Sequence, residues 1–364
     1  MSNLTMPRIN VIFTNAAKNF VPRGERGVVC LLLRDDTAAL LGQSYELLSA
    51  ADAPAGLAAS NRAAIAQTFL GGLNPPRKAL LYIFGGTGEG AVTLEDALGW
   101  AATQQFDWLA GPLDISAAEA EAVAAWIEEQ RSDCLQIYKA VLPNYAADSE
   151  AVVNFVGAGI KLDAETVLDA EDYCPRVAGL LAGTPLRISA TYAELPEVAD
   201  CTRLTPTELD AAVGAGKLVL WYDGAAVRLG RAVNSLTTTS ADKDDGWKKI
   251  KLVGVIDQMF YELRMLIITN YIGKFPNSYD NKLLLVTAIR DYFQALVTEG
   301  VLQPGFSVDI DEDAQRDWLV NHGYDVGSMS DREIREANTG SEVFLAAAVR
   351  PLDAIEDVTL NITI

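Results

Sequence analysis

Residues 255–296 constrain the fold of this chain more than any other stretch. Apolar residues recur there every three or four positions, so they form one stripe along a long helix: Ile256, Met259, Phe260, Leu263, Leu266 and Ile267. Gly273 and Pro276 end that helix, and a second apolar stripe follows in Leu285, Ile289, Phe293 and Leu296. The short connection predicts two long antiparallel helices packed against a sheet.

The preceding chain predicts that sheet. Residues 27–33 (GVVCLLL) are a continuous apolar run, which suits a strand buried on both faces. Further strands are expected at 43–48, 80–84, 106–110, 135–142 and 151–156, with a helix opened by Ser60 and capping boxes at Thr93 and Ser116. We also expect a short half-buried strand at 247–252, where apolar residues alternate with lysines. The alternation predicts an α/β fold, a mixed sheet flanked by helices.

Further predicted elements follow toward the C-terminus. Asp223-Gly224 lies between apolar runs at 217–222 and 227–233, which predicts a hairpin. Thr205 with Glu208 opens a short helix, and Ser330 with Glu333 opens another. A strand is expected at 306–310 and a helix at 314–322.

Both ends of the chain predict a β-strand. Ile9, Val11 and Phe13 indicate a short strand, although Ile12 breaks the alternation, and a tether that contains Pro22 and Gly24 follows. Apolar and polar residues alternate at the other end, where the apolar ones are Val358, Leu360, Ile362 and Ile364, and Gly340 and Pro351 interrupt the chain before them. Such a strand has an edge to donate or to fill. The residues alone leave open whether the terminal strands complete this chain's own sheet or pair with another chain.

Charge and composition exclude several classes of function. The chain has 29 basic and 49 acidic residues, a formal charge of -20, which repels nucleic acid phosphates and anionic lipid. No apolar run approaches the roughly 18 residues of a membrane helix, and we expect a cytosolic protein without a signal peptide. Its four cysteines are scattered, which indicates reduced packing residues and no metal cluster.

The sequence contains no convincing catalytic or cofactor site. The glycine cluster at 85–90 lies between a strand and a helix, but it has neither dinucleotide nor P-loop spacing, and Glu89 would repel a phosphate. The acidic run at 309–313 fits helix capping better than metal binding, and His322 is the only histidine. We predict no catalytic, cofactor-binding or metal residue and a non-enzymatic protein. The alternative is a cytosolic α/β nucleotide-binding enzyme that uses residues 85–90.

Several segments, in order, resemble contractile phage tail sheath proteins, in particular the compact sheaths of R-type, diffocin-like bacteriocins and related prophage tails. They are PRINVIF, ERGVVCLLLRD, RVAGLLAGTPL, RAVNSLTT, YIGKFPNSYDNK and EANTGSEVFLAAAVRPLDAIEDVTLNI. The resemblance implies an N-terminal arm and linker at 1–26, an α/β core at 27–342 divided at 230/231, and a C-terminal strand arm at 343–364. The interval between Leu33 and Leu80 has no room for the large outward-facing domain of bigger sheaths.

The resemblance also implies roles and partners. Strand exchange between subunits would use Ile9, Val11, Phe13, Val358, Leu360, Ile362 and Ile364, with hinges at Pro22, Gly24, Gly340 and Pro351. The implied partners are copies of this chain in a helical sheath of stacked rings, an inner tail tube protein, and baseplate and tail terminator proteins, without direct nucleic acid contact or membrane insertion. The sheath, assembled in the bacterial host cytoplasm and located in a virion or tail-like particle, would contract to drive the tube through a cell envelope.

Overall fold

The computed structural model describes residues 26–88 and 90–363, which divide into two compact units. Of the described residues, the larger unit contains 26–88, 90–261, 294–306 and 349–363, and the smaller one contains Glu262–Phe293 and Ser307–Ala348. These limits do not coincide with the segments 27–230, 231–342 and 343–364, which stay a prediction about the family's organisation. Within the described ranges, no helix combines the length and apolarity needed to cross a membrane.

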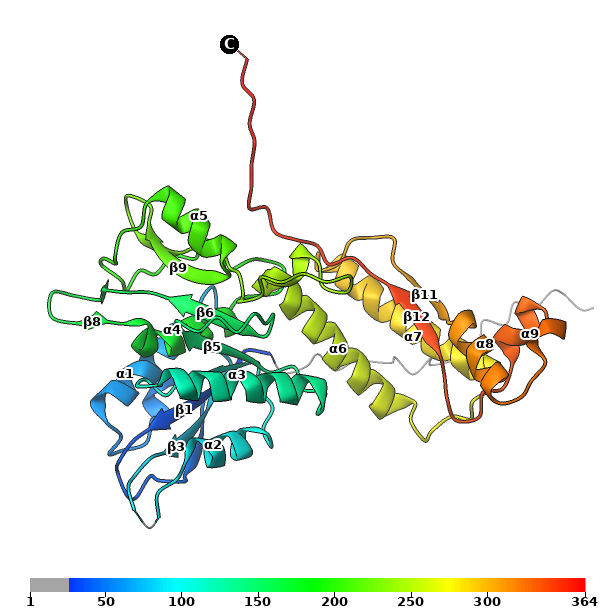
Figure 1. The fold of residues 1–364 in the computed structure, drawn as a ribbon, viewed down its shortest axis with the longest axis horizontal. Coiled ribbons are helices and arrows are strands. Elements are labelled where there is room, and N and C mark those ends of the chain that lie inside the picture. The colour runs from blue at the N-terminus through cyan, green and yellow to red at the C-terminus, as the bar shows by residue number, and fades with distance from the viewer. Residues whose placement is uncertain (1–25, 89, 364) are drawn as a thin grey trace, which may run out of the picture. The chain divides into compact units, whose positions relative to one another are not determined.

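The larger unit is built on an eight-stranded sheet with the order β10-β9-β6-β5-β4-β1-β3-β2. Its strands are β1 (Val28–Arg34), β2 (Ser44–Leu47), β3 (Lys78–Phe84), β4 (Trp108–Ala110), β5 (Lys139–Pro143), β6 (Val152–Val156), β9 (Lys217–Tyr222) and β10 (Val227–Leu229). The six inner strands pair in parallel, whereas β2 and β10 pair antiparallel at the two edges (Figure 1). The predicted mixed sheet and the predicted hairpin at Asp223-Gly224 are confirmed.

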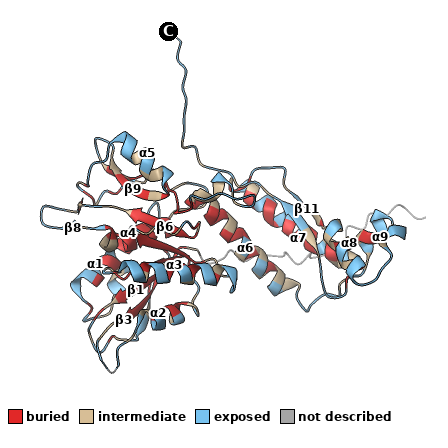
Figure 2. Cartoon of the chain, in the orientation of Figure 1, coloured by how far each residue is buried: buried red, intermediate tan, exposed pale blue. Residues whose placement is uncertain are grey.

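Helices cover both faces of this sheet. One core packs against α1 (Ala59–Thr68) and α4 (Ala170–Ala182), and the other packs against α2 (Leu94–Ala101) and α3 (Ala117–Ser132). Successive residues of β1 enter opposite cores, which confirms a strand buried on both faces (Figure 2). Helices α1 and α4 approach closely at Gly179, where an added Cβ would lie 2.0 Å from the carbonyl oxygen of Thr68.

Local capping signals fixed most helix starts. The predicted capping boxes are present at Thr93, Ser116, Thr205 and Ser330, the last two opening α5 (Pro206–Gly214) and α9 (Asp331–Glu336). Ser60 is not a cap, because α1 begins one residue earlier, after Ala58.

Two expectations around β5 are wrong. Strand β5 begins at Lys139 and not at 135, because Leu135 has a φ of 55°, outside the β region. Cys134 is exposed in the same turn, whereas Cys30, Cys174 and Cys201 are buried as expected of packing residues.

The short strand predicted at 247–252 is also wrong. The chain forms a 3-10 turn, η2 (Asp245–Lys248), and then enters α6 (Ile250–Asn270). The side chain of Asp244 accepts a hydrogen bond from the Gly246 N–H at 2.9 Å, which favours the turn, and the only ladder contact in this stretch is one bridge between Val233 and Lys249. The alternation is therefore the beginning of the helical stripe.

The smaller unit begins within α6 and includes most of α7 (Tyr279–Thr298). The Tyr271 hydroxyl donates to the carbonyl of Leu284 at 3.2 Å, and the Tyr292 hydroxyl donates to Glu262 at 2.6 Å. Since a later residue of α7 meets an earlier residue of α6, the two helices are antiparallel here, as predicted.

The remainder of the smaller unit is a short sheet with two helices. β11 (Ser307–Ile310) pairs antiparallel with β12 (Leu345–Ala348), and between them lie α8 (Glu312–Asn321), the 3-10 turn η3 (Val326–Ser328) and α9. The larger unit also contains the small pair β7 (Ile160–Lys161) and β8 (Val167–Leu168) and the 3-10 turn η1 (Ala50–Asp52).

Candidate assembly site at the C-terminal segment

The end of the chain has two parts, which we name the arm root (residues 350–357) and the terminal segment (residues 358–363). In the terminal segment Val358, Leu360 and Ile362 are 78%, 76% and 74% exposed. The structure assigns these residues no strand, and the segment runs outward to the C-terminus (Figure 1). The described chain thus has an exposed segment with alternating apolar residues that pairs with none of its strands. Ile364, Ile9, Val11, Phe13, Pro22 and Gly24 lie outside the described residues.

Backbone hydrogen bonds hold the start of the arm root. Pro351 forms an antiparallel bridge with Leu302. On either side of it, the Gln303 N–H donates to Arg350 and the Leu352 N–H donates to Val301, both at 2.8 Å. The Pro351 position is therefore paired in this structure, and its role as a hinge stays a prediction.

Lysine side chains from the start of α6 hold the next part of the root. Lys251 Nζ donates to the carbonyl of Leu352 at 2.6 Å, and Lys249 forms ion pairs with Asp353 and Glu356. Burial lowers the pKa of Lys249, but hydrogen bonding and the charges of Asp353 and Glu356 outweigh it, and the net pKa is raised. Burial lowers the pKa of Lys251. These contacts join the root to the rest of the larger unit.

Glu356 is the one deeply placed acidic side chain in the described root, at 6% exposure. Its Oε1 accepts hydrogen bonds from Ser189 Oγ at 3.0 Å and Thr191 Oγ1 at 2.6 Å. Oε2 lies 3.3 Å from Lys249 Nζ and 3.8 Å from Arg231 Nε. Three separate segments of the chain therefore converge on this carboxylate.

The smaller unit contains an open sheet edge. In the described chain β12 pairs only with β11, and the side chains of Ala346, Ala347 and Ala348 are exposed. On β11, by contrast, Arg290 Nη2 donates to the Val308 carbonyl at 3.1 Å. A further strand could therefore add beside β12.

Two polar side chains position the connector that leads into β12. Lys282 is buried and donates to Gln315 Oε1 at 2.9 Å and to the Ala337 carbonyl at 3.0 Å. Asn277 Nδ2 donates to the carbonyls of Gly340 and Glu342, both at 2.9 Å. Gly340 has a φ of 64°, a conformation that favours glycine. Its role as a hinge also stays a prediction.

A polar network fixes the start of α6 in the larger unit. Asp257 of α6 lies between Arg131 of α3 and Lys139 of β5, with nitrogen–oxygen distances of 2.8 Å to each. Burial raises the pKa of Asp257, but the two cations outweigh it and the net pKa is lowered. Sequence reasoning missed this cluster, for which the one available signal was a charge inside an apolar helical stripe.

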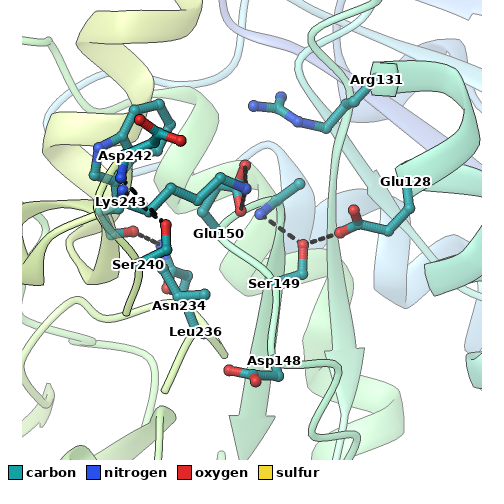
Figure 3. A network of polar contacts seen from close by, with 12 residues as sticks. Glu128, Arg131, Asp148, Ser149, Glu150, Asn234, Leu236, Ser240, Asp242 and Lys243 are labelled. Atoms are coloured by element: carbon teal, nitrogen blue, oxygen red, sulfur yellow. Dashed lines mark hydrogen bonds and ion pairs between the residues drawn. The ribbon is translucent and has the colours of Figure 1, made fainter. Parts of the chain in front are cut away.

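Figure 3 shows the contacts beside this cluster. Ser149 donates to Glu128 of α3, and Lys243 Nζ lies 2.8 Å from both oxygens of Glu150. The backbone N–H of Lys243 donates to Ser240 Oγ at 3.1 Å. The loop before α6 is therefore held against the β5–β6 connection.

The described residues of the glycine cluster, 85–88 and 90, are not arranged as a phosphate-binding loop. Gly85 and Val92 exchange two backbone hydrogen bonds of 2.9 Å, and the Gly86 N–H donates to Asp36. Thr93 and Asp96 cap the first turn of α2. The Gly85 and Gly86 amides are therefore used within the chain, the second of them by a carboxylate, and this geometry gives no support to the nucleotide-binding alternative.

The other candidate residues have structural contacts. Asp311 caps α8, as predicted, by accepting from the Ala314 N–H at 2.9 Å. The His322 ring stacks on Trp318 with centroids 3.7 Å apart. Across the described part of the chain, no group of three or more His, Cys, Asp or Glu residues is arranged to hold a metal ion.

The described chain combines an α/β core with an exposed apolar end, and comparison with known proteins gives the family. The family described as "Phage tail sheath C-terminal domain" matches residues 242–364. The chain is 35% identical over 359 residues to the tail sheath protein of Clostridium phage phiCD119, covering 97% of this chain and 98% of that protein. This chain therefore belongs to the tail sheath protein family, and it is a structural sheath subunit.

Solved structures have the same fold. The sheath tail protein of Desulfitobacterium hafniense matches with a TM-score of 0.66 and 20% identity, covering 84% of this chain and 94% of that one. The helical sheath of the anti-feeding prophage, in its contracted state, matches with a TM-score of 0.66 and 16% identity, covering 99% of each chain.

Proposed function

We propose that this subunit assembles into a helical, contractile sheath by donating residues 358–364 to the open β12 edge of a neighbouring copy. The observation that carries the proposal is the terminal segment itself, whose alternating apolar side chains are exposed without a strand partner in the described chain. Strand addition of this kind takes its affinity from main-chain hydrogen bonds and its specificity from alternate side chains.

The acceptor follows from the small sheet. A two-stranded sheet is marginal in water, and added strands stabilise it. The exposed alanines of β12 would allow a close approach of an added strand. The N-terminal residues Ile9, Val11 and Phe13 would add a second strand from another copy, so that two arms connect each subunit to its neighbours.

The proposed particle has further partners. The sheath would surround an inner tail tube protein and end at baseplate and tail terminator proteins, after assembly in the bacterial host cytoplasm. Contraction would drive the tube through a cell envelope, with flexion at Pro22, Gly24, Gly340 and Pro351. The subunit would act through its contacts with other proteins, without catalysis, direct nucleic acid binding or membrane insertion.

Cysteine crosslinking tests the strand donation. In a Cys134→Ser background, which removes the exposed thiol, Ile362→Cys is combined with Ala347→Cys, and Ile362→Cys with Ala97→Cys serves as the control. Ala97 is buried in α2 and cannot meet a partner strand. Oxidation of assembled sheaths should give a ladder of covalent multimers for the first pair, because paired strands bring Cβ atoms within disulfide reach. The same experiment can be repeated with a cysteine at each position of β12 in turn, always combined with Ile362→Cys. If every pair gives only monomers after oxidation, the proposal is wrong.

A further inference from the structure

The arm root is more ordered than a flexible connector, because its side chains alternate between exposed and enclosed positions. Ile355 is 90% exposed, the Glu356 side chain is 6% exposed and the Asp357 side chain is 81% exposed. This alternation is that of an extended chain with one inward side chain. A charged residue is rarely buried unless it is paired, so the inward position of Glu356 depends on its partners.

The partners of Glu356 come from three places in the larger unit. Ser189 and Thr191 donate hydrogen bonds to Oε1, while Lys249 and Arg231 face Oε2. Oε2 is buried without a hydrogen bond among the described residues. Its ion pairs with Lys249 and Arg231 therefore offset the cost of burying its charge. Because hydrogen bonds to charged groups are stronger than neutral ones, these contacts make a specific seat for a carboxylate.

We propose that Glu356 is the positioning residue that sets the direction and the face of the donated strand. This inference rests on the proposed strand donation. In an extended chain, side chains two residues apart point to the same side. Val358, Leu360 and Ile362 therefore share the side of Glu356 if the strand continues straight, and a slip of one residue at the root would turn all three to the opposite side.

The contacts of Glu356 also determine the residue after which the arm leaves the surface of the larger unit. Four residues of the root contact the rest of the larger unit: Leu352, Asp353, Glu356 and Asp357. After Asp357 the structure gives residues 358–363 no strand. A clamp at 356 leaves the donated strand at full length and removes conformational freedom from the root, which lowers the entropic cost of joining a neighbour.

Two variants with matched charge separate the clamp from general electrostatics. Glu356→Gln and Asp357→Asn each remove one negative charge, and both carboxylates face Arg231, but the Glu356 side chain is 6% exposed and the Asp357 side chain is 81% exposed. Both are made in a Cys134→Ser background with a spin label at Ile355→Cys, an exposed position. The measurements are label mobility in free subunits, the critical concentration for sheath formation and the thermal midpoint.

Glu356→Gln should increase label mobility and raise the critical concentration roughly tenfold or more, the size of effect expected when a hydrogen bond to a charged group is lost. Asp357→Asn should change neither strongly, and the thermal midpoints should agree, because the root lies outside the core. Ser189→Ala is a milder second variant, which should change both quantities in the same direction as Glu356→Gln. The inference is overturned if Glu356→Gln has the same critical concentration for sheath formation as the native subunit. It is also overturned if Asp357→Asn raises that concentration equally.

A deletion distinguishes the role of Glu356 from the strand donation on which it rests. If a chain without residues 358–364 assembles normally, strand donation is wrong whatever Glu356 does. If the deletion blocks assembly while Glu356→Gln assembles normally, donation stands and the clamp alone is wrong.

Discussion

At the scale of single residues, the sequence predicted contacts between close neighbours and missed those between distant ones. The capping boxes at Ser116 and Ser330 join residues three positions apart, so their pattern is visible in the sequence. The partners of Asp257 and Glu356 come from elements more than 100 residues away, and a lone charge in the sequence does not name its partner. Buried ion pairs are therefore the part of this protein that required the structure.

The Asp257 cluster gives a prediction about stability. Asp257→Asn should lower the free energy of unfolding by about 3 to 5 kcal/mol, because Arg131 and Lys139 would remain buried without their anion. Urea denaturation of the subunit measures this. Asp245→Asn is the control, since its carboxylate is 87% exposed and pairs only with Lys248 in the described chain. Equal stabilities of the two variants would contradict the account.

The same carboxylate predicts a pH dependence. The pKa of Asp257 is lower in the folded protein than in the unfolded chain, where it is about 3.9. Its contribution is therefore complete above about pH 4 to 5 and is lost as the pH falls through the folded pKa. The difference in unfolding free energy between the native protein and Asp257→Asn should be constant near neutral pH and shrink in acid. A difference that grows in acid would show that the assignment is wrong.

At the scale of elements, strands and helices with long or regular patterns were predicted well, and short patterns were not. The α6–α7 pair has a long helical period, and β1 is a continuous apolar run of the length of a buried strand. At 247–252 the alternation covers too few residues to separate a strand from the first turn of a helix, and the Asp244 turn decides the outcome. The terminal segment also has a clear period, but its partner strand is a matter of assembly, which the pattern of one chain does not contain.

Removal of the terminal segment tests the separation of folding from assembly. Deletion of residues 358–364 should leave a folded subunit that forms no sheath, because Val358, Leu360 and Ile362 are exposed and contribute little to the core. Circular dichroism reports the fold and sedimentation reports the polymer. Unfolding of the deletion variant would mean that the segment completes the subunit itself.

At the scale of the whole molecule, charge should govern assembly. Each subunit has a formal charge of -20, and at 0.15 M salt screening acts over roughly 8 Å. Subunits therefore repel at low ionic strength, and polymerisation should strengthen as salt rises. Light scattering across a salt series measures this, and steady loss of polymer with added salt would instead indicate ion pairs between subunits.

In the proposed strand donation, each subunit alone has an unpaired β12 edge and an unpaired terminal segment, and both would be paired only in the assembled sheath. The most direct test is a high-resolution reconstruction of the assembled sheath. We predict that residues 358–364 of each subunit lie as a strand beside β12 of a neighbouring copy, with Glu356 still seated on Ser189 and Thr191 of its own chain. A terminal segment folded onto its own subunit, or a β12 edge without an added strand, would contradict this account.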